Sequence, residues 1–280
     1  MRFSAFTSLV LVAAFSVSVS SAPLPSQDDE AVFIREISSE KRGYYTFPSY
    51  AKGGNAQSGN SGNADGGSVG NFGWKIINYP YANKAGNGGL TASGKAVGGS
   101  GPGGGGSAVS GNTGNANGGS VYNEGAYIVN GAHANTAGNG GYAISGNAIG
   151  GNAKRSPGGA YGGGGYSPYG SYYGNYGKGG DAQTGNSGDA NGGDVVNIGG
   201  KIFNGPYANK AGNGGLSKTG TAIGGNGPGG GGNAVSGNAG NANGGSVYNS
   251  GSVIVNGPHA NTAGNGGVSI SGNAYGGNAY

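Results

Sequence analysis

Residues 237–256 read Gly-Asn-Ala-Gly-Asn-Ala-Asn-Gly-Gly-Ser-Val-Tyr-Asn-Ser-Gly-Ser-Val-Ile-Val-Asn. The end of this stretch, 252–256, has the composition and patterning of a short β-strand with one apolar face, and 126–130 and 268–271 are similar. The part at 237–245 contains only Gly, Asn and Ala. Because Gly and Asn tolerate positive φ, this part is predicted to form a tight corner between strands.

The stretch belongs to a set of four tandem repeats. A shift of 126 residues aligns 52–153 with 178–279 without a gap, and 77 of the 102 aligned residues are identical. Within each half, a shift of 52 residues superimposes Gly54–Ser68 on Gly106–Ser120. Repeats of this length are typical of stacked architectures.

These patterns predict a mostly β or low-complexity chain of Gly/Asn-rich repeats. In a β-solenoid like residues of successive repeats would stack, and Asn side chains would form amide ladders. None of the 34 Asn residues begins a glycosylation sequon, which fits Asn side chains that must stack. The competing interpretation is an unfolded, elastic Gly-rich chain.

Composition argues against a conventional enzyme core. The chain has 73 Gly among 280 residues, and only thirteen Val, Ile, Leu, Phe or Trp lie between residues 52 and 153. At that density, apolar burial does not easily offset a backbone ordering cost of about 1–2 kcal/mol per residue. The absence of Cys excludes disulfides and thiolate metal sites, and a net charge of +4 without a basic stripe argues against nucleic acid as a partner.

The beginning of the chain predicts secretion. Residues 1–21 combine Arg2, an apolar run too short to span a bilayer, and small residues that suit cleavage after Ser21. No other stretch approaches transmembrane length, so we expect no membrane span. Residues 22–42 hold five of the ten acidic residues and end in Lys41-Arg42, which is typical of an acidic pro-segment.

A second dibasic pair, Lys154-Arg155, falls where the other copy of the repeat has its C-terminus. This placement predicts cleavage by a kexin-like protease after both Lys-Arg pairs. The expected products contain module 1 (43–153) and module 2 (178–280), with the cleavage site and a flexible Gly/Tyr-rich linker at 154–177. The alternative is that the two pairs are exposed and have no function.

The signal peptide, acidic pro-segment, Lys-Arg pairs and tandem array resemble the kexin-processed repeat proteins that fungi secrete, a class that includes the repellents of hyphal surfaces. The chain also resembles Gly-rich structural proteins of cell walls. The resemblance implies an extracellular role at the wall or at an interface, and no active site.

Tyrosines gather before each module, as at Tyr44, Tyr45 and Tyr50. They make either a flexible linker with weak ring stacking or a tether for oxidative cross-linking. The candidates in the linker are Tyr161, Tyr166, Tyr169, Tyr172, Tyr173 and Tyr176.

Two motifs only partly match binding sites. Gly89–Lys95 matches most of a phosphate-binding loop, but Ala96 replaces the Ser or Thr that would hold magnesium. Asp189 and Asp194 have a spacing faintly like that of a calcium loop, but the other three repeats lack the paired acids. We therefore expect no metal site and no cofactor site.

His133 and His259 occupy equivalent positions in the second and fourth repeats, where the first and third have Tyr81 and Tyr207. This alternation predicts a slot for a planar ring. No acid or nucleophile recurs beside the histidines, as catalysis would require, so we expect no catalytic residue and no enzyme activity.

The sequence thus favours a secreted structural protein of the cell wall or extracellular matrix that acts by self-association. Its expected partners are further copies of itself, wall or matrix polymers, and the processing protease. The first alternative is a secreted effector or signal released from a repeat precursor. The second is an ice- or surface-binding solenoid, suggested by Ala-Asn-Thr at 134–136 and 260–262, although Lys84 and Lys210 interrupt that array.

Overall fold

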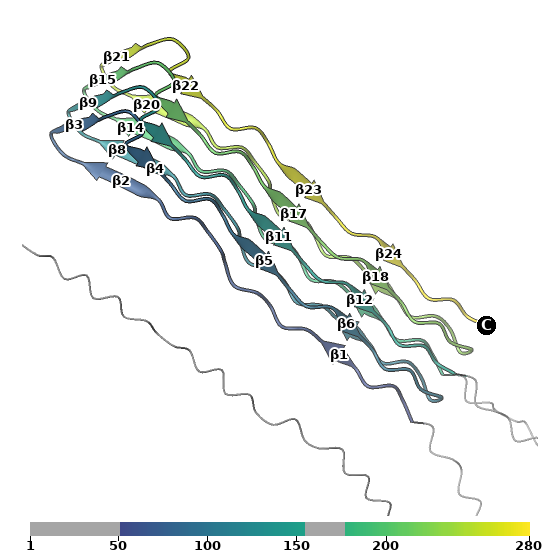
Figure 1. The fold of residues 1–280 in the computed structure, drawn as a ribbon. Coiled ribbons are helices and arrows are strands. Elements are labelled where there is room, and N and C mark those ends of the chain that lie inside the picture. Colours follow the sequence, from purple (N-terminus) through teal and green to yellow (C-terminus); the bar gives the residue numbers. More distant parts are fainter. Residues whose placement is uncertain (1–50, 155–176) are drawn as a thin grey trace, which may run out of the picture. The chain divides into compact units, whose positions relative to one another are not determined.

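The computed structural model describes residues 51–154 and 177–280, and in these ranges it contains strands and no helix. Each repeat forms one flattened coil of six short strands, and the four coils lie one on another (Figure 1). In chain order we name them coil A (51–104), coil B (105–154), coil A′ (177–230) and coil B′ (231–280).

The strands are two to four residues long. Coil A contains β1 (Ala56–Gln57), β2 (Val69–Phe72), β3 (Lys75–Asn78), β4 (Asn83–Lys84), β5 (Leu90–Ala92) and β6 (Ala96–Val97). Coil B contains β7 (Ala108–Val109), β8 (Val121–Glu124), β9 (Tyr127–Asn130), β10 (Asn135–Thr136), β11 (Tyr142–Ile144) and β12 (Ala148–Ile149). Coil A′ contains β13 (Ala182–Gln183), β14 (Val195–Ile198), β15 (Lys201–Asn204), β16 (Asn209–Lys210), β17 (Leu216–Lys218) and β18 (Ala222–Ile223). Coil B′ contains β19 (Ala234–Val235), β20 (Val247–Ser250), β21 (Val253–Asn256), β22 (Asn261–Thr262), β23 (Val268–Ile270) and β24 (Ala274–Tyr275).

Equivalent strands of the four coils pair in parallel, which gives six sheets of four strands. The register follows the repeat: Ala56 pairs with Ala108, Ala108 with Ala182, and Ala182 with Ala234. The step between partners is therefore 52, 74 and 52 residues, so the 22 additional residues between coils B and A′ do not change the register. The predicted β-rich fold with stacked repeats is confirmed.

Each coil consists of two legs joined at a tip. In coil A the outgoing leg is 51–74 with β1 and β2, the tip is 75–82 with β3, and the return leg is 83–104 with β4, β5 and β6. The legs pack face to face over a thin core of small side chains. One cluster contains Ala from the β1-type and β6-type strands, the second contains Val and Ala nearer the tip, and Ile76, Ile128 and Ile202 form the third.

The predicted strands are present as β9, β21 and β23, but the predicted corner at 237–245 is wrong. This segment is part of the outgoing leg and contains no turn. Its carbonyls accept hydrogen bonds from the neighbouring coil. The Ala190 N–H, for example, donates to the Asn241 carbonyl oxygen at 2.7 Å. In coil B the equivalent leg buries every third residue from Ser110 to Gly119, which matches an extended chain with three residues per turn.

Glycine is needed along the legs because backbones approach one another without side chains between them. The Gly86 N–H donates to Gly67 O across the coil at 2.8 Å, and the Gly119 N–H of the next coil donates to Gly86 O at 2.8 Å. The series continues through the stack, so the two legs are joined by backbone hydrogen bonds that alternate from one leg to the other. A Cβ at most of these glycines would overlap a backbone carbonyl of a neighbouring segment.

A matched pair of substitutions tests this steric role. A Cβ on Gly114 would lie 2.6 Å from the Gly62 carbonyl oxygen, whereas a Cβ on Gly62, the same position in coil A, has nothing within 4 Å. We expect Gly114→Ala to lower the free energy of unfolding by at least about 2 kcal/mol. Gly62→Ala should leave it unchanged or raise it by up to about 1 kcal/mol. Denaturant unfolding of the full chain followed by circular dichroism measures both, and equal effects would contradict the close approach.

Candidate functional site: side-chain ladders and the open ends of the stack

Three ladders of asparagine side chains are the most regular polar feature of the structure. In each ladder the Nδ2 of one coil donates to the Oδ1 of the next at 2.7–2.8 Å. The ladders consist of Asn71, Asn123, Asn197 and Asn249; of Asn78, Asn130, Asn204 and Asn256; and of Asn83, Asn135, Asn209 and Asn261. The predicted Asn ladders are therefore present.

The three ladders converge inside the tip. Bonds of 3.2–3.4 Å connect neighbouring ladders, such as Asn123 Nδ2 to Asn135 Oδ1 and Asn130 Nδ2 to Asn197 Oδ1. In the middle coils these side chains are buried: Asn123, Asn135 and Asn197 are 0% exposed. Buried amides are tolerated here because each finds partners in identical residues above and below it.

A second kind of ladder lines the outer surface. Here an Oδ1 atom accepts a hydrogen bond from the backbone N–H of the equivalent residue in the next coil. The Asn112 N–H, for example, donates to Asn60 Oδ1 at 2.7 Å. Asp189 and Asp194 belong to this set, because their Oδ1 atoms accept N–H groups of Asn241 and Ser246 at 2.7 and 2.6 Å. In the described ranges no group of three or more His, Cys, Asp and Glu side chains could hold a metal ion.

One column of aromatic rings follows the turns at the tip. Tyr81, His133, Tyr207 and His259 stack with ring centroids 5.3 Å apart and planes within 15° of parallel. All four have positive φ, between 52° and 62°, a conformation that turns usually reserve for Gly or Asn. The predicted slot for a planar ring is confirmed. The four residues that fill it carry some backbone strain, because they are not glycines and have positive φ.

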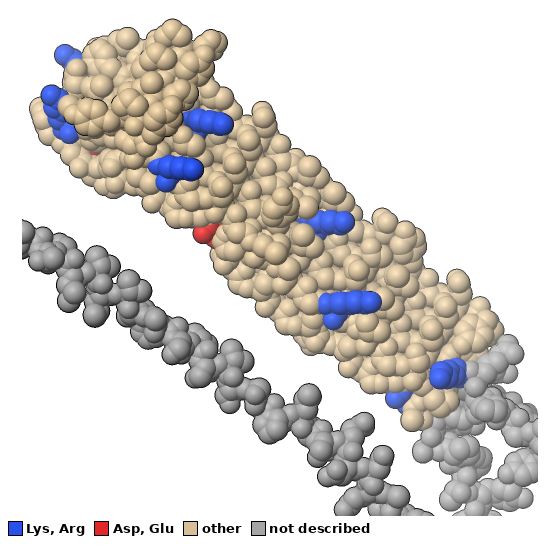
Figure 2. Space-filling view, viewed as in Figure 1, with Lys and Arg blue, Asp and Glu red and all other residues tan. Residues whose placement is uncertain are grey.

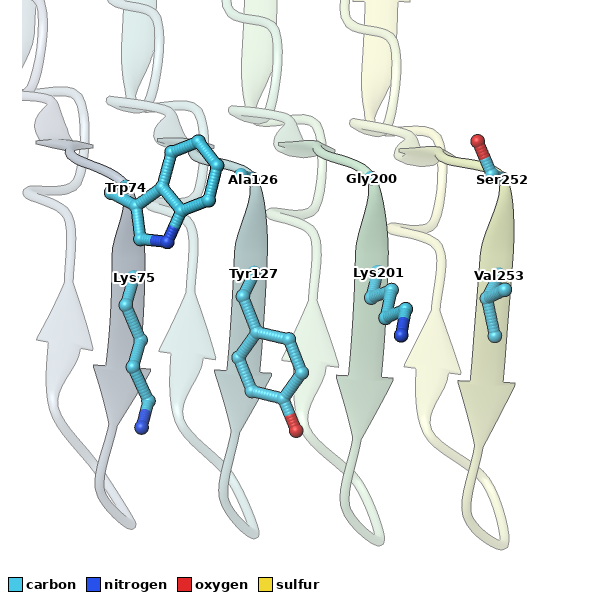
Figure 3. Close-up of a pocket in the computed structure, with 8 residues that line it drawn as sticks. All are labelled: Trp74, Lys75, Ala126, Tyr127, Gly200, Lys201, Ser252 and Val253. Carbon is cyan, nitrogen blue, oxygen red and sulfur yellow. The ribbon is translucent and has the colours of Figure 1, made fainter.

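The outer side of the tip is hollowed (Figure 3). A groove of about 560 Å³ crosses all four coils along two rows of residues. One of its cations lies beside a ring: Lys75 Nζ is 5.8 Å from the ring centroid of Tyr127. Unlike the ladders, the rows change chemistry from coil to coil, from exposed Trp74 to Ser252, so they present no repeated binding unit. On the adjacent β8, the Tyr122 hydroxyl donates to Glu124, and this bond raises the pKa of Tyr122.

In the part of the chain that the structure describes, the two ends of the stack are open and complementary. Asn78 Oδ1 has no donor from a preceding coil, and Asn256 Nδ2 has no acceptor in a following one, among the described residues. The cross-leg backbone series likewise leaves the Gly67 N–H at one end and the Gly264 carbonyl at the other without a partner in the described ranges. Ile254 is 38% exposed, whereas Ile128 and Ile202, its equivalents inside the stack, are 0% exposed.

The structure places few of the other residues singled out in the sequence. Lys154 is exposed at the end of coil B, with its N–H bonded to Gly101 O. The region of Gly89–Lys95 that matches a phosphate loop contains strand β5. The predicted signal peptide and pro-segment lie outside the described ranges. The remaining cleavage-site and cross-linking candidates lie outside them too: Lys41, Arg42, Arg155, Tyr161, Tyr166, Tyr169, Tyr172, Tyr173 and Tyr176.

Sequence reasoning did not identify the convergence of the Asn ladders. The signal for it is an Asn triplet spaced by seven and then five residues, at 71, 78 and 83, which recurs in all four repeats. No protein-family model, curated protein or solved structure matches the chain. The described part of the chain contains no helix of the length and apolarity needed to cross a membrane.

The inner and outer ladders should differ in their contribution to stability. Asn197→Ala removes a buried partner from Asn123 and Asn249, so we expect a loss of about 2–4 kcal/mol in the free energy of unfolding. Asn186→Ala in an exposed outer ladder lets water replace the lost acceptor, so its loss should stay within about 1 kcal/mol. Denaturant titration of both variants checks this. An equal loss would show that the buried ladders contribute no more to the free energy of unfolding than the outer ladders do.

Proposed function

We propose that this protein is a secreted structural component of the cell wall or extracellular matrix, not an enzyme, and that it acts by self-association. We further propose that the stack is a β-solenoid whose copies join end to end. The observation that carries the proposal is the pair of open, complementary ends. Edge strands with unpaired backbone groups and no protecting cap are templates for pairing with another chain.

The junction between coils B and A′ provides the template for the joint between copies. Coil B′ has the same inner-ladder Asn positions as coil B, and coil A has those of coil A′. If B′ of one copy stacks on A of the next, Ile254 covers Ile76, and His259 stacks on Tyr81 as His133 stacks on Tyr207. The Asn256 amide then donates to Asn78 of the next copy, and all three inner ladders continue.

Such a joint is heterologous, because two different surfaces meet. A heterologous contact without closing rotation produces an open filament. Processing is compatible with this arrangement: after a cut at Lys154-Arg155, coils B and A′ would still be held by all six sheets. Cleavage would therefore produce two-coil pieces that remain stackable, which suits a wall material.

The structure gives less support to the alternative of an ice-binding face than to self-association. Lys84, Thr136, Lys210 and Thr262 form one column, so the threonines alternate with lysines along it. A flat array of like side chains is therefore absent from this column.

Two glycine substitutions test end-to-end association without disturbing the single chain. A Cβ on Gly62 or on Gly266 would have nothing within 4 Å. At the equivalent glycines inside the stack, the Cβ position is directed at a neighbouring coil, so at these two it is directed at the place where the next copy would lie. Sedimentation velocity should show concentration-dependent multimers of the full chain. Gly62→Ala and Gly266→Ala should each weaken association about tenfold or more.

Lys201→Val, an outward substitution at the tip of the inner coil A′ that copies Val253 of coil B′, is the control and should assemble normally. A full chain that remains monomeric at high concentration would refute the proposed function. Assembly that tolerates both glycine substitutions would refute the end-to-end joint.

Secretion and processing are tested by intact mass. We expect the native protein in wall extracts, as species that begin after Arg42 and after Arg155. An uncut chain beginning at Ala22 would contradict processing. Species found only free in the medium would favour the effector alternative.

A further inference from the structure

The two legs of the coils have opposite charge. All five side-chain carboxylates in the described ranges lie on outgoing legs: Asp65, Glu124, Asp181, Asp189 and Asp194. The outgoing legs also hold two lysines, Lys52 and Lys178, so their net charge is negative. The return legs have five lysines and no described acid: Lys84, Lys95, Lys154, Lys210 and Lys218. Figure 2 shows lysines at intervals along the molecule with little acidic surface on the same face.

Because the legs pack face to face, their outer sides are opposite faces of a slab. We call the outer side of the outgoing legs the acidic face and that of the return legs the basic face. The ion pair between Lys178 and Asp181, at 3.5 Å, lies within the acidic face. It is the single salt bridge in the described ranges, so the return-leg lysines pair with none of the carboxylates in these ranges.

In coil A′ the opposite charges are at matching heights along the slab. The Gly212 N–H donates across the coil to Gly193 O at 2.9 Å, and this bond lies between Lys210 on one face and Asp194 on the other. The Ser217 hydroxyl donates to Gly188 O at 2.9 Å, which places Lys218 level with Asp189.

An apolar column on the basic face and a mixed Val/Gln column on the acidic face accompany these charges. On the basic face, Val97, Ile149, Ile223 and Tyr275 follow one another in register, and Val97 and Tyr275 are 52% and 54% exposed. On the acidic face, at the level of the same Ala core cluster, Val109 and Val235 alternate with Gln57 and Gln183.

We propose that the basic face binds the acidic face of a second copy of this chain, so that slabs pack side by side by simple translation. In that arrangement Lys210 meets Asp194 and Lys218 meets Asp189, while the apolar column of the basic face covers the Val/Gln column of the acidic face. The inference rests on the proposed function, because it adds a lateral contact to end-to-end association. Filaments would thereby gather into layers whose cohesion depends on salt.

The test separates the two contacts by using a chain in which Gly62→Ala blocks the end joint. Small-angle X-ray scattering and sedimentation should detect side-by-side dimers and larger rows of this variant at low salt. In 1 M salt, where the screening length is about 3 Å, the rows should dissociate.

Neutralising variants use residues that other coils already have in the same columns. Lys210→Thr with Lys218→Ala removes the basic partners, and Asp189→Asn with Asp194→Ser removes the acidic partners while keeping oxygen acceptors for the outer ladders. Each pair should weaken lateral association about fivefold or more. Lys75→Tyr with Lys201→Val, which removes the same charge from the tip, is the control and should not weaken it.

The outcomes distinguish the proposals. Lateral rows that survive both neutralising pairs or 1 M salt would overturn the inference, as would rows weakened by the Lys variant alone, which would assign the basic face to another anionic partner. Filaments from the parent chain without lateral rows would overturn it and leave the proposed function intact. If the parent chain forms neither filaments nor rows, the proposed function itself fails.

Discussion

The structure depends on one constraint: each residue stacks on its own counterpart in the next coil. Identical amides can serve one another as donor and acceptor, and the Nδ2 to Oδ1 bonds of 2.7–2.8 Å in the tip show this directly. The same rule satisfies the backbone, because every sheet is parallel and in register. A chain that obeys this rule can bury polar side chains with little apolar area.

The constraint also explains the composition. Where two legs must approach at backbone distance, a Cβ would overlap a carbonyl, so Gly is required by space more than by φ. Where a side chain points inward beneath a strand, Ala or Val fills the thin core. In the described ranges, the last coil presents the surface that a further coil would cover. This surface is the physical basis of the self-association that we propose.

Much of this was predictable from the sequence. The 52-residue shift fixes the register, since like residues must align, and the Asn positions within it give the ladders. The role of the Gly-Asn-Ala segments was not predictable, because a glycine needed for a corner and one needed for close packing look alike in sequence. The convergence of Asn71, Asn78 and Asn83 depends on turn geometry at the tip. The opposite charge of the two faces becomes visible only when residues are assigned to outgoing and return legs.

The most direct test of the account uses the absence of cysteine from the chain. Gln57 on β1 and Val235 on β19 occupy the same outward column at opposite ends of the stack. Three strand spacings of about 4.8 Å separate them, too far for a disulfide within one chain. In a Gln57→Cys/Val235→Cys variant, mild oxidation should give a series of covalent multimers on a non-reducing gel, because the two positions become neighbours at every joint. A variant that remains a covalent monomer under conditions in which it assembles would contradict in-register stacking between copies.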